Sequence, residues 1–166
     1  MATTLSVSLG ISALADYTAT TPHEGAVTEK LLNNTGGRQW TNGIASGQAD
    51  RVYRKTGTLA AAATDSFNTL AAGALLDVYG QGIDLDELKG LVIKCTSGSI
   101  KLDAPAANFI GIFADASDLI KVPLDCTMAF DFGASGLDVT TNSKFDVVDL
   151  AGGAGSTYEL MFWGAQ

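Results

Sequence analysis

Apolar and polar residues alternate most regularly in residues 122–132. Every second position of this stretch is apolar, and polar or small residues fill the gaps; the apolar positions are Val122, Leu124, Cys126, Met128, Phe130 and Phe132. Because successive side chains of a strand point to opposite faces, this spacing predicts one β-strand with its apolar face on a core. Pro123 lacks a backbone donor, so it should lie at the beginning of the strand or at a sheet edge. We expect this strand to be the best-anchored segment of the molecule.

Other short apolar or alternating runs follow one another from residue 50 onward, separated by turns rich in Gly, Asn, Ser and Asp. The predicted strands cover residues 51–59, 66–70, 91–95, 100–103, 122–132, 137–139, 145–150 and 157–163. Short strands at such intervals, with hardly any helix between them, are typical of a sandwich or jelly roll. The sequence therefore predicts an all-β fold, a jelly-roll-like β-sandwich of about eight strands with an extended N-terminal arm.

The N-terminal region has a different pattern. Alternation at its start, through Leu5, Val7, Leu9 and Ile11, predicts a strand or an arm that becomes a strand against a partner. Residues 24–32 allow one or two helical turns, and residues 33–37 have the composition of a turn. We therefore divide the chain into an extended arm and irregular contact segment, residues 1–49, and a β-sandwich domain, residues 50–166.

The charge balance limits the possible partners. The formal net charge is −8, and 17% of the residues are charged against 46% hydrophobic. An acidic surface disfavours non-specific binding to nucleic acid, and no apolar run approaches the length of a membrane span, so neither partner is expected. Residues 1–11 contain no Lys or Arg, so no secretory signal is expected.

Few residues are suited to catalysis or metal binding. His23 is the only histidine, and nothing beside it resembles the setting of a nucleophile. Residues 84–87 and 115–118 concentrate carboxylates without the spaced ligands of a calcium loop, so capping and turn-closing roles are favoured. We expect no catalytic, metal or cofactor site, and hence no enzyme.

Cys95 and Cys126 are the only two cysteines, and both lie in apolar strand patterns. Two buried free thiols are the favoured interpretation. A single disulfide is the alternative if the two strands are neighbours.

Two features indicate contact with other proteins. Arg51 and Arg54 form a local cationic cluster with Lys55. The favoured interpretation is a cluster that only decorates its strand and turn, and the alternative is docking on an acidic protein surface, because Arg side chains bind carboxylates at interfaces. The closing run places large apolar groups on both faces, which predicts either a strand between two layers or a strand whose second face meets another subunit. The predicted contact residues are Leu5, Val7, Leu9, Ile11, Arg38, Trp40, Arg51, Arg54, Met161 and Trp163.

Several short motifs resemble those of tailed-phage virion proteins that decorate or cement the capsid. They are SGQADRVY at residues 46–53, TLAAAATDS at 58–66, LKGLVI at 88–93, FADASD at 113–118 and a closing aliphatic and aromatic strand that ends at Gly164. The resemblance implies a jelly roll on the exterior of the capsid, made in the bacterial host cytoplasm. It also implies the major capsid protein as partner and self-association as a homotrimer, with a dimer as second choice.

We therefore expect a structural virion protein that stabilises the shell by bridging capsid subunits. The alternative is a host-surface or carbohydrate-binding module of a tail or fibre. For that alternative, exposed Trp40, Tyr53 or Trp163 would stack on sugar rings.

Overall fold

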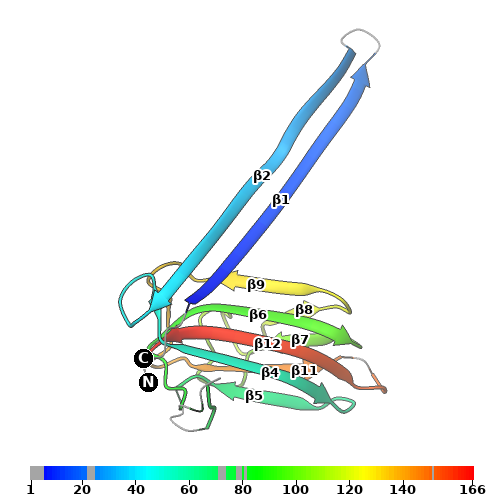
Figure 1. The fold of residues 1–166 in the computed structure, drawn as a ribbon. Coiled ribbons are helices and arrows are strands. Elements are labelled where there is room, and N and C mark those ends of the chain that lie inside the picture. Colours follow the sequence, from blue (N-terminus) through cyan, green and yellow to red (C-terminus); the bar gives the residue numbers. More distant parts are fainter. Residues whose placement is uncertain (1–5, 22–24, 71–73, 78–79, 81, 151) are drawn as a thin grey trace.

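The computed structural model describes residues 6–21, 25–70, 74–77, 80, 82–150 and 152–166, with side chains described from residue 38 onward. Its regular elements in this part of the chain are all strands (Figure 1). Their bounds are β1 Ser6–Thr21, β2 Gly25–Asn42, β3 Gln48–Ala49, β4 Arg51–Leu59, β5 Thr64–Asn68, β6 Glu87–Ser97, β7 Ile100–Asp103, β8 Leu119–Val122, β9 Thr127–Asp131, β10 Leu137–Asp138, β11 Lys144–Asp149 and β12 Ser156–Ala165.

Two sheets pack against each other to form the body of the molecule (Figure 1). One sheet has the order β10-β6-β12-β4, with β9 also paired to β6, and the other has the order β5-β11-β7-β8. All these pairs are antiparallel. We call them the β6–β12 sheet and the β11–β7 sheet.

The order of pairing defines the fold. Because β9 and β10 pair with consecutive parts of β6, they act as one interrupted strand, and the sandwich then has eight strands in chain order. The first strand neighbours the eighth, the second the seventh, the third the sixth and the fourth the fifth. This nested pairing is a jelly roll, one long hairpin rolled into two layers. The predicted all-β, jelly-roll-like sandwich of about eight strands is confirmed.

The core lies between the two sheets and consists of alternate residues of their strands. In β12 the core residues are Tyr158, Leu160 and Phe162, all at most 1% exposed. Phe145 of β11 packs edge to face on Phe162, with ring centroids 6.0 Å apart, and stacks on Phe67 of β5 at 5.0 Å. Aromatic contacts across both layers thus hold the two sheets together.

The stretch 122–132 is two strands, and the prediction of one well-anchored strand is wrong. β8 ends at Val122, and Cys126 N donates to Pro123 O across a turn in which Asp125 has a φ of 58°. β9 then begins in the other sheet. The alternation continues through the turn, so it hides the change of sheet, and Leu124 is 53% exposed.

The arm also differs from the prediction at several positions. Residues 25–42 form strand β2, so neither the helical turns at 24–32 nor the turn at 33–37 is present in the described residues. β2 pairs antiparallel with β1 over nearly its whole length, and the resulting hairpin projects far beyond the sandwich (Figure 1). Gly36 and Gly37 lie opposite Ile11 and Gly10, where cross-strand pairing outweighs their turn preference. The division of the chain at residue 49 stays a prediction.

Candidate interaction surface at the root of the arm

A second apolar cluster fixes the arm, β1 and β2, to the outer face of the β6–β12 sheet. Trp40 of β2 packs edge to face on Trp163 of β12, with ring centroids 5.2 Å apart. Both side chains are buried, and Ala49 and Val52 complete the cluster. We call these four residues the arm root. Because side chains alternate along β12, Trp163 lies on the face opposite the sandwich core.

Gly90 makes room for this contact. It lies opposite Trp163 in the β6–β12 pairing, and a Cβ added at Gly90 would be 2.2 Å from the indole ring. No larger residue fits there without moving the ring. The backbone of β6 and the indole are therefore matched in shape.

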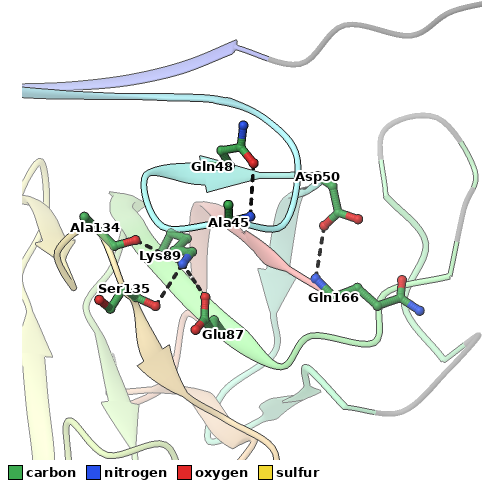
Figure 2. A network of polar contacts seen from close by, with 8 residues as sticks. All are labelled: Ala45, Gln48, Asp50, Glu87, Lys89, Ala134, Ser135 and Gln166. Atoms are coloured by element: carbon green, nitrogen blue, oxygen red, sulfur yellow. Dashed lines mark hydrogen bonds and ion pairs between the residues drawn. The ribbon is translucent and has the colours of Figure 1, made fainter.

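Polar contacts surround the arm root. Arg38 Nε of the arm lies 3.3 Å from Asp131 Oδ2 of β9. Asp50, which follows β3, bonds to the last residues of the chain. Its N–H donates to Gly164 O at 3.0 Å, and its Oδ1 accepts from Gln166 N at 3.1 Å (Figure 2). Of these contacts, the one between Arg38 and Asp131 ties β2 directly to the sheet.

Lys89 holds a loop beneath the arm. Its side chain is fully buried, and its ammonium donates to Glu87, to Ala134 O at 3.0 Å and to Ser135 O at 2.8 Å (Figure 2). All three donors of the ammonium are therefore used. Ala134 O also accepts from Gly47 N at 2.9 Å, so the same loop supports the segment that follows the arm.

The outer face continues beyond the root as an open hollow of about 290 Å³. Its floor contains Val92 and Met161, which also pack against the arm root. Arg54 and Lys94 stand at its sides, and neither has an ion pair among the described residues. The hollow is lined by Arg54, Val92, Lys94, Thr127, Glu159, Leu160 and Met161. The lining thus carries two cations and one carboxylate, Glu159, around an apolar floor, which suits a protein segment that carries apolar and acidic side chains.

The predicted contact residues that the structure describes fall into four groups. Arg54 and Met161 line the hollow, whereas Arg38, Trp40 and Trp163 hold the arm inside the chain itself. Arg51 bonds to Asp50 at 2.9 Å and to Gln166 at 2.8 Å. On β1, Val7, Leu9 and Ile11 lie opposite Trp40, Arg38 and Gly36 in the register, and Leu5 lies outside the described residues.

Sequence reasoning missed Lys89, Val92 and Lys94. Lys89 had a signal, because a lone cation within the apolar run 88–93 must be either paired or at the end of a strand. The sequence held no signal for Val92 and Lys94, because no local pattern shows that the arm leaves one end of the outer face of the β6–β12 sheet uncovered.

Other sequence predictions concern chemistry. Asp118 Oδ2 accepts from Ala114 N at 2.7 Å and Asp115 N at 3.1 Å, so residues 115–118 close a turn as predicted. In the described residues no three His, Cys, Asp or Glu side chains are placed to hold a metal ion. His23 lies outside them. Nor does this part of the chain hold a helix that is long and apolar enough to cross a membrane.

The residues named for sugar stacking are not available as the alternative function requires. Trp40 and Trp163 are 0% and 1% exposed. Tyr53 is half-buried and stacks on Phe162 of the core, with ring centroids 4.9 Å apart. The exposure that the alternative function requires is therefore absent for Trp40 and Trp163, and Tyr53 presents only part of its ring.

Comparison with known proteins does not identify a family for this chain. No family model matches the chain, and no curated protein matches it. Among solved structures, the coat protein of tobacco streak virus is similar over 70% of this chain and 88% of that chain, with a TM-score of 0.31 and 9% sequence identity. The assignment to the jelly-roll class rests on the strand pairing alone.

Proposed function

We propose that this chain is a structural virion protein that binds the exterior of a tailed-phage capsid. In this role it bridges major capsid subunits and stabilises the shell, without enzymatic activity. The observation that carries the proposal is the long β1–β2 hairpin, which projects from a jelly roll and is fixed to it by its own apolar cluster (Figure 1).

The hairpin has the reach that bridging requires. At about 3.3 Å per residue, the 16 residues of β1 span roughly 50 Å. A two-stranded hairpin is at best marginally stable alone in water, whereas its strand edges can pair with a neighbouring sheet. Contact with a shell subunit would supply both the pairing and the stability.

The hollow beside the arm root provides a second contact. A protein that binds through two sites forms the second contact intramolecularly, which raises its total affinity. Arg54 and Lys94 would pair with carboxylates of the capsid protein, whereas the net charge of −8 keeps free copies soluble. Self-association as a homotrimer, with a dimer as second choice, would multiply these contacts further.

Co-sedimentation with isolated expanded capsids that lack the protein tests the proposal. The full chain should sediment with the capsids and raise their thermal stability. The double variant Arg54→Glu with Lys94→Glu should bind about tenfold more weakly, because charge reversal leaves acidic partner groups repelled.

The matched control is Lys121→Glu with Lys144→Glu, two cations of the other sheet that also lack an ion pair among the described residues. It should bind as the wild type does. Absence of co-sedimentation for the wild type would overturn the proposed function. Equal loss in both double variants would overturn only the role of the hollow. Native mass measurement decides between trimer and dimer.

A further inference from the structure

Cys95 and Cys126 lie next to each other across two chain segments. Cys95 N of β6 donates to Cys126 O at 3.1 Å, and Asp125 N donates to Cys95 O at 3.0 Å. Two residues therefore oppose one, which is a β-bulge. Facing residues on neighbouring antiparallel segments have Cα atoms about 4.5–5.5 Å apart, and a disulfide bridges Cα atoms roughly 4.4–6.8 Å apart.

Both cysteines also contact the same core. Cys95 is fully buried with Leu91 and Ile93 in the core of the sandwich. Cys126 is half-buried and packs against that cluster from the bulge. Both are free thiols in this structure. They are thus two neighbouring thiols on the core side of one sheet, of which one is partly accessible.

We propose that Cys95 and Cys126 are a cross-linking site that forms an intramolecular disulfide when the folded chain meets a small disulfide such as oxidised glutathione. The proposal does not depend on capsid binding.

The reaction has two exchange steps. The Cys126 thiolate attacks one sulfur of oxidised glutathione, and one glutathione thiolate leaves. Cys95 then loses its proton to solvent, and its thiolate attacks Cys126 Sγ and releases the second glutathione. Two protein thiols are oxidised, and one glutathione disulfide is reduced to two thiols. Burial raises the pKa of the Cys95 thiol, so the second step should be the slower one.

The product would tie β6 to the turn between β8 and β9. The cross-link would close the segment between residues 95 and 126 in the unfolded chain, which lowers its conformational entropy. The oxidised protein should therefore unfold at a higher temperature than the reduced protein.

The test treats folded full-length protein with excess oxidised glutathione at mildly alkaline pH. Intact mass and thiol titration after denaturation are then measured. The wild type should lose the mass of two hydrogen atoms and both titratable thiols, and peptide mapping should join residues 95 and 126. Its unfolding temperature should rise and return after reduction.

Two variants separate the roles of the cysteines. Cys95→Ala should keep a stable glutathione adduct on Cys126, because the resolving thiol is absent. Cys126→Ala should keep its one buried thiol unmodified. A wild type that retains both thiols, accumulates the adduct or forms disulfide-linked dimers would overturn the proposal. The wild-type measurement decides even if a variant does not fold.

Discussion

Ala62 has a conformation that alanine rarely adopts. It lies in the turn between β4 and β5 with a φ of 58°, and its N–H donates to Asp149 Oδ2 at 3.0 Å. Ala63 N closes the turn by donating to Ala60 O at 3.0 Å. The left-handed region costs a residue with a Cβ about 1–2 kcal/mol, which the two hydrogen bonds offset.

Ala62→Gly should therefore raise the free energy of unfolding by about 0.5–1 kcal/mol, after allowing for the greater freedom of glycine in the unfolded chain. Urea denaturation followed by circular dichroism measures the change. Ala61→Gly is the matched control, since Ala61 has no positive φ, and it should not stabilise the protein. A stabilisation of equal size in both variants would exclude the conformational explanation.

The buried ammonium of Lys89 is stabilising only because three acceptors surround it. Lys89→Met retains most of the side-chain volume but removes the ammonium donor from Glu87 and Ser135 O, and one of the two donors from Ala134 O. The free energy of unfolding should fall by roughly 3 kcal/mol. Lys94→Met on the same strand removes an exposed cation and should change it by less than about 0.5 kcal/mol. Chemical denaturation of both variants checks the difference, and equal effects would show that Lys89 is not held as described.

The contact between β2 and β12 can be followed by fluorescence. Trp40 and Trp163 are the only two tryptophans of the chain, and they pack on each other at the arm root. Tryptophan emission, excited at wavelengths that the four tyrosines do not absorb, therefore reports on this contact. The wild type should emit at short wavelength and be poorly quenched by acrylamide.

Gly90→Ala should shift the emission to longer wavelength and increase quenching, because the new Cβ displaces the Trp163 ring from which it would be 2.2 Å away. The sandwich core should survive, with a loss of about 2 kcal/mol in the free energy of unfolding. Gly153→Ala serves as control because a Cβ there meets nothing within 4 Å. Unchanged emission in Gly90→Ala would mean that the arm root can adjust around the methyl group.

Strand periodicity made the sandwich predictable, because each core strand alternates and its turns contain turn-forming residues. Phe145 and Val147 of β11 follow that pattern and are buried. Periodicity could not reveal the turn at Pro123, because apolar and polar residues keep alternating there while the chain passes from one sheet to the other. Nor could it reveal the pairing of Trp40 with Trp163, because only the tertiary fold brings together residues so far apart in the chain.

The stability of the protein should depend on acid through two exposed carboxylates. A side-chain and a backbone hydrogen bond from Ser117 lower the pKa of Asp115, and equivalent bonds from Thr140 lower the pKa of Asp138. Because the pKa of each carboxyl is lower in the folded protein than in the unfolded chain, its ionised form stabilises the folded protein at pH values above the unfolded pKa, about 4. This stabilisation is lost as the pH falls through the folded pKa.

Thermal unfolding measured over a series of pH values should therefore show a plateau above pH of about 4 and a decline below it. Asp138→Asn should unfold at a slightly lower temperature on the plateau and lose less on acidification than the wild type, because one of the two carboxylates no longer titrates. An acid dependence identical to that of the wild type would show that the hydrogen bonds from Thr140 do not persist in solution.

Because of the nested pairing of the jelly roll, the β6–β12 sheet can close only after the last strand of the chain has left the ribosome. β12, residues 156–165, lies between β4 and β6, so the β6–β12 sheet has a gap until that strand has been synthesised. Trp40 emerges more than a hundred residues before Trp163, the ring that buries it. The arm root therefore cannot form until nearly the whole chain has been made, and truncated chains lack the surface that holds the arm. A partner that recognises the rooted arm and the hollow together would select finished molecules from unfinished ones.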